Sequence, residues 1–226
     1  QSRSMKEDGA AQSLFTAVSG LRSVQPRWFF KKIDTALRGN IGVEMLSMLR
    51  ALEVRCALSI SSIPGAGRTT VGGIQYYRGK PIKESIHGED RYNPNPVWTS
   101  SHIELLSKIP ELDIENIPLA EVRSGSLRIS NRINGRGKRV LVFDSETDED
   151  IDRIVRASMD LEPATFFYAG SFGLSRSLGR YLVNSFPGIP SLPAAPVVKG
   201  PSRETGRVLI VSGSSHPMAH AQMARP

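Results

Sequence analysis

Short apolar runs alternate with amphipathic segments along most of the chain, and this alternation is what most restricts the possible folds. Four segments have apolar residues at the three- and four-residue spacing of a helix: 7–21, 41–52, 148–159 and 173–183. Four short apolar runs are typical of buried strands: 28–30, 54–59, 140–143 and 164–168. Strands that alternate with helices form a mostly parallel sheet covered on both faces. The sequence therefore predicts a three-layer, Rossmann-like α/β fold.

Two stretches interrupt this alternation. Residues 64–95 are rich in glycine, proline and polar residues, and within them 73–82 has the pattern of a β-hairpin that turns at Arg78 and Gly79. Such insertions commonly carry ligand contacts. A short helix is expected over 100–108, capped by Ser100 or Ser101. Residues 186–201 contain five prolines, which favours a linker, and a further apolar strand is expected at 208–211.

The composition excludes several classes of protein. The 226 residues include 39% apolar residues, enough for a sizeable core, and no apolar run approaches the roughly 20 residues that span a bilayer. The first residues are polar and lack the apolar region of a signal peptide, so we expect a soluble, cytoplasmic protein without a membrane partner. Cys56 is the single cysteine and excludes an internal disulfide. No histidine or cysteine pattern predicts a metal site.

The net charge of +7 suits either a polyanion partner or an enzyme that holds carboxylates and phosphates. The basic residues are spread along the chain, and the densest group, at 132–139, has no interleaved aromatic residues. We therefore expect no nucleic-acid partner. A nicotinamide-dependent dehydrogenase is an alternative that rests on the α/β pattern alone, because the G-x-G-x-x-G fingerprint is absent.

Polar side chains cluster where the expected strands end, which is where parallel sheets bind ligands. Lys32, Asp34 and Arg38 follow the first strand, and a glycine-containing stretch after the second leads to Arg68, followed by Thr69 and Thr70. Arginine can hold a carboxylate with two hydrogen bonds, and aspartate accepts hydrogen bonds from hydroxyl groups. These residue types suit a sugar acid. The alternatives are a capped helix start for the first group and a tight turn for the second.

Two further turns carry small residues after a strand. One contains Gly170, Ser171 and Gly173, and opens a predicted helix whose N-terminal N–H groups suit an anion. The other contains Ser212, Gly213 and Ser214. Small residues are common at such turns, so each signal alone is weak, and the two together suggest phosphate binding.

Six segments, in order along the chain, resemble those of a known family. Residues 30–42 resemble its K-x-D-S/T-x-L-R-G-N segment, 67–73 its G-R-T-T-x-x-G segment, and 144–150 its D-A-x-T-D-x-D-L strand end. Residues 93–103, 170–174 and 212–214 resemble the segment that follows the hairpin, the G-S-x-G-L turn and the start of the nucleotide domain. On these motifs the chain is similar to the four-carbon acid sugar kinases.

The resemblance implies an enzyme that transfers the γ-phosphate of ATP, with Mg²⁺, to a hydroxyl of threonate, erythronate or a similar acid. It implies substrate binding by Lys32, Asp34, Arg38, Arg68, Thr69 and Thr70. In this assignment Arg38 and Arg68 hold the carboxylate or stabilise the transferring phosphoryl group. It implies nucleotide binding by Gly170, Ser171, Gly173, Ser212, Gly213 and Ser214. No catalytic base is assigned.

The resemblance also predicts the domain organisation. We expect a substrate-binding domain over 1–186, a proline-rich linker over 187–206, and the start of a nucleotide-binding domain over 207–226. The family's opening D-D-x-T-G-A-x-D segment and its later glycine-rich segments have no counterpart here. The chain is therefore expected to be a truncated gene product or a fragment of a longer protein, with a substrate-binding domain that lacks its first strand or strands. A non-catalytic module that binds the acid is therefore the main alternative to a kinase. The sequence leaves the oligomeric state open, with a homo-oligomer among the alternatives.

Overall fold

The computed structural model describes residues 2–89, 95–124, 129–133 and 137–185, together with 221, 222 and 224. Contacts divide the chain into two units, Gln1–Tyr181 and Leu182–Pro226. The sheets and all of the site residues described below belong to the first unit. Apart from those three residues, the predicted linker and the predicted start of a nucleotide domain lie outside the described part of the chain.

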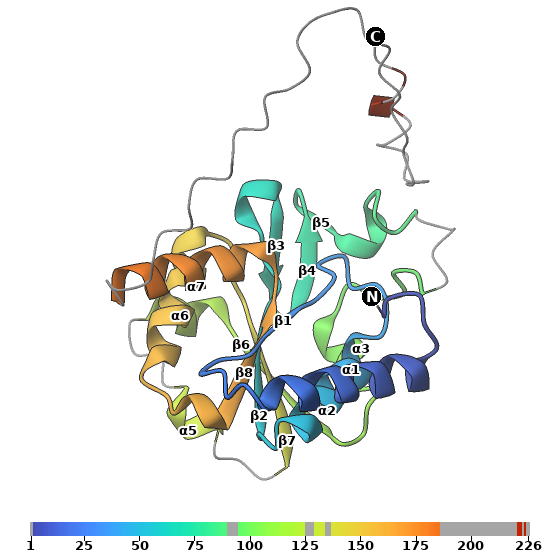
Figure 1. The fold of residues 1–226 in the computed structure, drawn as a ribbon. Helices are drawn as coiled ribbons and strands as arrows, with labels where there is room; N and C mark the ends of the chain where they lie inside the picture. The colour runs from blue at the N-terminus through green and yellow to red at the C-terminus, as the bar shows by residue number, and fades with distance from the viewer. Residues whose placement is uncertain are drawn as a thin grey trace, which may run out of the picture. The chain divides into compact units, whose positions relative to one another are not determined.

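A five-stranded parallel sheet forms the centre of the first unit, with the strand order β1-β8-β2-β7-β6 (Figure 1). Its strands are β1 (Phe30–Lys32), β2 (Cys56–Ile60), β6 (Leu112–Ile117), β7 (Lys138–Phe143) and β8 (Phe166–Gly170). The helices are α1 (Glu7–Arg22), α2 (Ile41–Ala51), α3 (His102–Leu106), α4 (Leu119–Arg123), α5 (Ser130–Ile133), α6 (Asp148–Met159) and α7 (Phe172–Ser185). Three short 3₁₀ helices are η1 (Pro64–Ala66), η2 (Ile82–Glu84) and η3 (Pro163–Thr165). The predicted fold class is confirmed.

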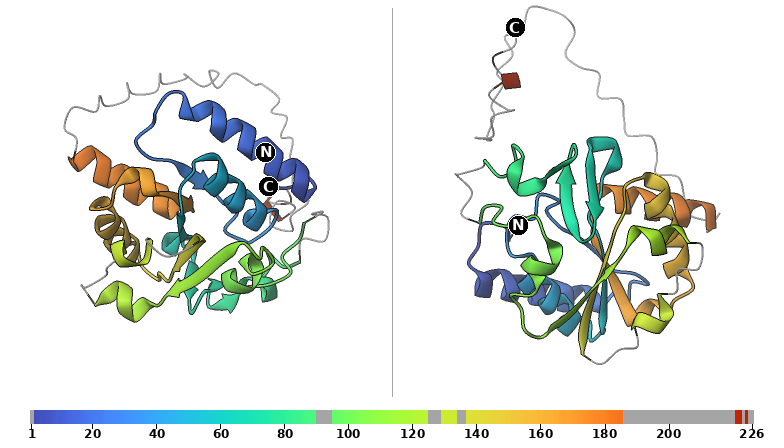
Figure 2. Two further views of the ribbon diagram at one scale, coloured as in Figure 1. Left: turned by 90° about the horizontal axis from the view of Figure 1, so that it is seen from below. Right: turned by 180° about the vertical axis from the view of Figure 1, so that it is seen from behind.

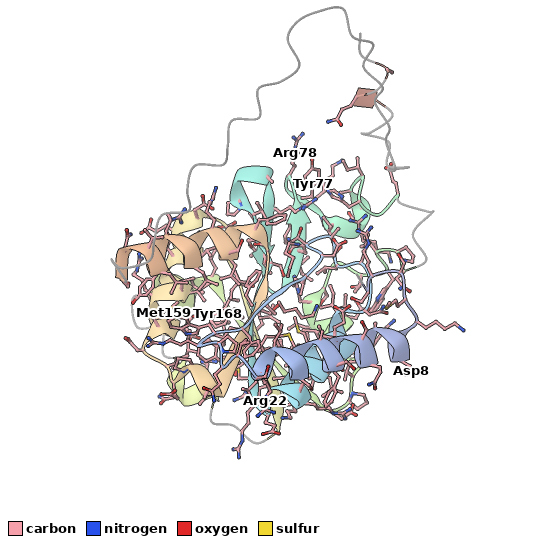
Figure 3. The ribbon with its side chains drawn as sticks, in the orientation of Figure 1. Asp8, Arg22, Tyr77, Arg78, Met159 and Tyr168 are labelled. Carbon is pink, nitrogen blue, oxygen red and sulfur yellow. The ribbon has the colours of Figure 1, made fainter. Side chains whose placement is uncertain are left out.

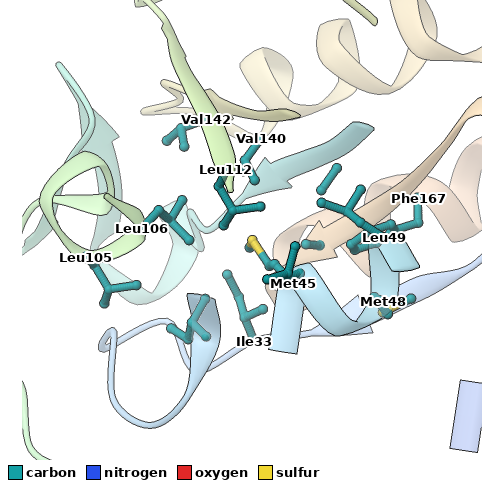
Figure 4. Packing of buried hydrophobic residues seen from close by; sticks show 14 of the residues in the cluster. Ile33, Met45, Met48, Leu49, Leu105, Leu106, Leu112, Val140, Val142 and Phe167 are labelled. Carbon is teal, nitrogen blue, oxygen red and sulfur yellow. The ribbon is translucent and has the colours of Figure 1, made fainter. Parts of the chain in front are cut away.

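Two hydrophobic clusters cover the two faces of the sheet. Alternate residues of a strand point to opposite faces, so Ala57 of β2 joins the cluster with α1, α2 and α3, whereas Leu58 joins the cluster with α4, α6 and α7. Figure 2 shows α1 and α2 on one side of the sheet and α6 and α7 on the other. Figure 4 shows how Met45 and Leu49 of α2 pack towards Val140 and Phe167 of the neighbouring strands. All five residues of β2 are buried, as expected for a central parallel strand.

The chain leaves neighbouring strands towards opposite faces. After β1 and β2 it continues to helices of the α2 and α3 side, and after β7 and β8 it continues to α6 and α7 on the other side. The strand order is β1-β8-β2-β7, so each neighbouring pair among these four strands continues to helices on opposite faces of the sheet. Such switch points open a crevice at the carboxyl ends of the strands, where open α/β sheets bind ligands.

A three-stranded antiparallel sheet stands at this carboxyl edge. It consists of β3 (Arg68–Val71), β4 (Ile74–Tyr77) and β5 (Lys80–Pro81). The predicted hairpin turn at Arg78 and Gly79 is confirmed, and both residues have the positive φ of a two-residue hairpin turn. Gly72 and Gly73 form an equivalent turn before β4. The residues of β3, expected to form a loop, are therefore a strand, because they pair with β4 along their whole length.

Three side chains fasten this hairpin to the parallel sheet. The carboxylate of Asp144, which follows β7, accepts hydrogen bonds from the N–H groups of Gly72 (2.7 Å) and Gly73 (3.0 Å) and from the amide of Asn116 (2.9 Å). The hydroxyl of Ser62, which follows β2, lies 3.1 Å from the hydroxyl of Thr70. Backbone bonds join Thr70 to Ser145 in both directions. The hairpin is thus held at a fixed place on the edge.

Most predicted elements are present, with some shifts and omissions. The predicted helices at 7–21, 41–52 and 148–159 correspond to α1, α2 and α6. The first strand lies two residues later than expected, and β6 and α4 were not predicted. In the described ranges, no helix combines the length and the apolar character that crossing a bilayer requires.

Gly170 ends β8 at a point of close approach between strands. A Cβ atom at this position would lie 2.1 Å from the carbonyl oxygen of Ile60 in β2, far inside van der Waals contact. The obstacle is backbone and cannot rotate away. Only glycine fits here.

We predict that Asp144→Asn destabilises the fold by about 2–3 kcal/mol, because the new amide turns a donor towards N–H groups that lose their acceptor. Urea denaturation measures this. The control is Asp160→Asn, at an exposed position, which should change stability by less than about 0.5 kcal/mol. Equal effects of the two substitutions would show that Asp144 does not fasten the hairpin.

We also predict opposite effects of alanine at two glycines. Gly170→Ala should cost about 3 kcal/mol or more through the clash with Ile60. Gly179→Ala, in the interior of α7 where the added Cβ meets nothing within 4 Å, should raise stability by about 0.5–1 kcal/mol. Thermal unfolding of both variants tests this, and a tolerated Gly170→Ala would contradict the close approach.

Candidate functional site

Asp34 occupies the centre of the candidate site, directly after β1. Its Oδ1 accepts a hydrogen bond from the N–H of Ala36 (2.8 Å), which turns the chain back at once. Its Oδ2 accepts from Nε of Arg38 (2.9 Å) and from Nη1 of Arg3 (3.1 Å). Burial raises the pKa of this carboxyl, but Arg38, the Ala36 N–H and Arg3 together lower it further, so the pKa lies below its ordinary value. Asp34 is therefore an ionised carboxylate shared by two guanidinium groups.

Arg3 reaches Asp34 because two amide side chains hold the segment around it. Nδ2 of Asn40 donates to the carbonyl oxygens of Ser2 and Met5, both at 3.0 Å. Nδ2 of Asn95 donates to the carbonyl oxygens of Arg3 (2.8 Å) and Met5 (3.2 Å). The side chain of Arg3 keeps 43% of its surface exposed, so a ligand at the edge can reach it. The sequence-based site did not include Arg3.

Arg68 projects from β3 towards the same loop. Its Nη1 donates to Oγ1 of Thr35 (2.7 Å), and its Nη2 lies 3.0 Å from Nε2 of His87. The guanidinium carbon lies 5.9 Å from the centre of the Tyr77 ring. Burial lowers the pKa of Arg68 and Asp34 opposes this. The ordinary pKa of arginine is so high that the side chain keeps its charge at neutral pH.

Lys32 adds a further cation beside Asp34. Its Nζ donates to the carbonyl oxygen of Ile33 and lies 4.9 Å from the centre of the Phe172 ring. Burial lowers the pKa of Lys32, Asp34 raises it, and the charges of Arg68 and Lys31 lower it. We name Arg3, Lys32, Asp34, Arg38 and Arg68 the cationic cluster; at neutral pH its four cations and one carboxylate carry a net charge of +3. An excess of positive charge at an open edge favours an anionic ligand.

The two threonines predicted beside Arg68 have different positions. Thr70 is only 1% exposed, and its hydroxyl contacts Oε1 of Gln75 (2.9 Å) as well as Ser62. These contacts fasten the hairpin, and the contact of Thr70 with a substrate stays a prediction. Thr69 is half-buried, and strand alternation places it on the opposite face of the hairpin from Arg68. The structure therefore brings Lys32, Asp34 and Arg38 together with Arg68, but not with Thr69.

His102 completes the support of the hairpin from beneath. Complete burial lowers its pKa to about 4, so the imidazole is neutral at physiological pH. Its Nε2 lies 3.0 Å from Oε1 of Gln75, a carbonyl-type acceptor, so Nε2 carries the proton and donates. This buried pair is structural.

The predicted nucleotide turn at 170–173 is packed against β2. The N–H of Ser171 donates to the carbonyl oxygen of Ile60 (3.1 Å). The hydroxyl of Ser171 donates to the carbonyl oxygen of Ser62 (2.5 Å). A Cβ atom on Gly173 would lie 2.5 Å from the same Ser62 oxygen. Close packing thus accounts for Gly170, Ser171 and Gly173, and their contact with a nucleotide stays a prediction. Ser212, Gly213 and Ser214 lie outside the described residues.

Two cavities lie away from this edge. One of about 530 Å³ is lined by residues that precede strands, including Phe29, Val54 and Ala164, and so lies at the amino edge of the sheet. The other, of about 650 Å³, lies beside α4 and α6 and is lined by Arg123 and Arg153 among others. Neither contains the converging charges of the cationic cluster. We place the candidate site at the carboxyl edge because of these charges and the switch points there.

Sequence reasoning missed the parts of the site that come from distant segments. Arg3 belongs to a stretch that precedes α1, and His87 lies after η2 in the hairpin insertion. Thr35 stood within the recognised motif, but only the structure shows that its hydroxyl accepts from Arg68. The motif over 30–42 could have indicated that Thr35 belongs to the site. No comparable sequence pattern indicated His87.

Known proteins resemble the chain in both sequence and structure. The sequence model of a family described as "Sugar-binding N-terminal domain" matches residues 1–178. A D-threonate kinase from Salmonella typhimurium is 30% identical over 180 residues, which are 79% of this chain and 42% of that protein. A D-erythronate kinase from Heliobacterium modesticaldum is 29% identical over 161 residues, 70% of this chain and 36% of that protein.

A solved structure from Bordetella bronchiseptica, described as a domain of unknown function with bound citrate and as a domain-swapped dimer, superimposes with a TM-score of 0.68. It is 25% identical, and the match covers 82% of this chain and 44% of that one. The chain thus spans less than half the length of each of these three proteins. The chain belongs to the four-carbon acid sugar kinase family, and residues 1–178 correspond to its sugar-binding N-terminal domain.

Proposed function

We propose that the cationic cluster binds the carboxylate of a four-carbon acid sugar of the threonate or erythronate type. The observation that carries the proposal is the sharing of Asp34 between Arg3 and Arg38, with Arg68 and Lys32 close by. Within the five described residues of the cluster, positive charge exceeds negative charge, which suits an anionic ligand. Asp34 itself accepts hydrogen bonds and suits the hydroxyl groups that distinguish a sugar acid from a simple carboxylate.

We further propose that the chain supplies the sugar-binding part of an ATP-dependent kinase that acts in sugar-acid catabolism in the cytoplasm. The names of the similar kinases and the matching family support this proposal. Phosphoryl transfer depends mostly on positioning and on electrostatic stabilisation of the transferring group. Arg38 and Arg68 fit either role, since guanidinium groups match both carboxylate and phosphate geometry. The bound citrate in the Bordetella structure is consistent with an anion site in this fold.

ATP and Mg²⁺ are proposed as phosphoryl donor and cofactor, and when bound they would supply the γ-phosphate and neutralise its charge. Among the residues that the structure describes, no three His, Cys, Asp or Glu side chains converge as metal ligands. Asp34 is already engaged by two arginines, and the turn at 170–173 is engaged by β2. The described residues therefore suit the acid, and the binding of ATP and Mg²⁺ stays a proposal.

One second candidate is a module that binds the acid without phosphorylating it. The family model that matches residues 1–178 is described as a sugar-binding domain, which supports this candidate. A homo-oligomer is proposed as the assembled form, in line with the dimer described for the Bordetella protein. The two candidates share the acid site and differ in whether phosphate is transferred.

The test is calorimetric titration of the 226-residue chain with D-threonate, L-threonate and D-erythronate, with and without Mg-ATP. At least one acid should bind, and Arg68→Ala or Arg38→Ala should weaken it about tenfold or more, the value of one charge-assisted hydrogen bond. The matched control is Arg156→Ala, an exposed arginine of α6 outside the cluster, which should bind as the wild type does.

The outcomes separate the candidates. Binding together with formation of ADP and a phosphorylated acid supports the kinase, whereas binding without turnover supports the acid-binding module. If none of the three acids binds, or if Arg156→Ala weakens binding as much as Arg68→Ala does, the assignment of the acid to the cationic cluster is wrong.

A further inference from the structure

His87 must act as the hydrogen-bond acceptor in its contact with Arg68. A guanidinium group has five N–H donors and no acceptor, so Nε2 of His87, at 3.0 Å from Nη2 of Arg68, must offer its lone pair. An imidazole that accepts at Nε2 is neutral and carries its proton on Nδ1. The contact therefore specifies both the charge and the tautomer of His87.

Contacts other than the one with Arg68 also hold the imidazole in place. His87 is 9% exposed, and its backbone N–H donates to the hydroxyl of Ser85 (3.2 Å), which in turn donates to the carbonyl oxygen of Ile82 (2.7 Å). Its ring meets that of Tyr77 edge to face, with centroids 4.7 Å apart and an angle of 77°. Figure 3 shows Tyr77 on the hairpin that also carries Arg68. The acceptor is thus fixed by contacts within the hairpin insertion.

Arg68 is consequently gripped from two different segments. Thr35 in the loop after β1 accepts from Nη1, and His87 accepts from Nη2. The Nε–H of Arg68 is buried and finds no hydrogen-bond partner in the described part of the chain. A long arginine side chain loses conformational freedom when it is ordered, so a residue that orders it beforehand strengthens ligand binding.

We propose that His87 is a positioning residue for the anion site: in its neutral form it fixes the guanidinium of Arg68 for the carboxylate of the ligand. This inference rests on the proposed acid-binding function. Protonation of His87 would place a second donor and a second positive charge against Arg68, which disrupts the contact. Among the residues that the structure describes, the charged and titratable groups around the contact include Arg68 of β3, Tyr77 of β4 and, beyond Arg68, Asp34 and Arg38.

Two variants at this position separate the acceptor from the ring. His87→Gln keeps an acceptor oxygen near the position of Nε2, and His87→Phe keeps an aromatic ring against Tyr77 but has no acceptor. With D-threonate and D-erythronate as probes, the Gln variant should bind within about threefold of the wild type. The Phe variant should bind about tenfold more weakly. Thermal unfolding of both variants shows whether the fold is intact.

A measurement without ligand decides the inference independently. In ¹⁵N NMR spectra of the wild-type chain at about pH 7.5, His87 should be the neutral Nδ1–H tautomer. The Nη protons of Arg68 should exchange with water more slowly in the wild type than in His87→Phe. A protonated Nε2, or identical Arg68 signals in both proteins, would overturn the inference.

The two failures remain distinguishable. If the wild type and His87→Phe bind the acids equally well at every pH, His87 has no positioning role while the proposed function stands. If the wild type binds none of the acids, the proposed function fails, and the NMR result alone decides whether His87 holds Arg68.

Discussion

The parallel pairing of β2 with both β7 and β8 is the constraint on which the rest of the structure depends. It buries all five residues of β2 and brings the segments after β1, β2, β7 and β8 to one edge of the sheet. Ser62, Asp144 and Ser171 each use this shared edge for a bond to another segment. Because these bonds connect the segments that follow different strands, the segments are not independent loops. The hairpin is attached to this cross-linked edge.

Electrostatic strain at this edge is the second organising feature. Four cations surround one carboxylate, and burial as well as mutual repulsion lowers the pKa values of Lys32 and Arg68. Such an arrangement opposes folding unless other interactions compensate, because like charges repel more strongly where water is partly excluded. Asp34 relieves part of the strain by accepting from Arg3 and Arg38. An anionic ligand would relieve more, which gives a physical reason for an acid to bind here.

The site is assembled from three segments that are distant in sequence. The loop after β1 supplies Asp34 and Arg38, the hairpin insertion supplies Arg68 and His87, and the stretch before α1 supplies Arg3. Thr35 joins the first segment to the second through its contact with Arg68, and Asn40 joins the first to the third through Ser2 and Met5. The same side chains that tie these segments together also orient the cations.

The sequence by itself determined the α/β class, most helices, the Arg78–Gly79 turn and four of the charged residues at the site. These features depend on local patterns: a 3.6-residue period, a turn that needs positive φ, and polar residues that follow apolar runs. The edge strand β6 escaped prediction because Asp113 and Glu115 make its sequence polar. In the structure Arg139 of β7 pairs with both carboxylates, and Arg132 also pairs with Glu115. Likewise Arg68 to Val71 resembled a loop, because the strand exists only through its partner β4.

Only the tertiary structure decided which polar residues hold the fold together and which charged residues come together at the carboxyl edge. Thr70, Ser171 and Asp144 are also polar, but their side chains form hydrogen bonds within the protein. Thr70 bonds to Gln75, Ser171 to Ser62, and Asp144 to Gly72. Arg3 and His87 entered the site through contacts across 31 and 19 residues of sequence. No local pattern encodes such contacts, because they arise from the packing of whole strands and loops against one another.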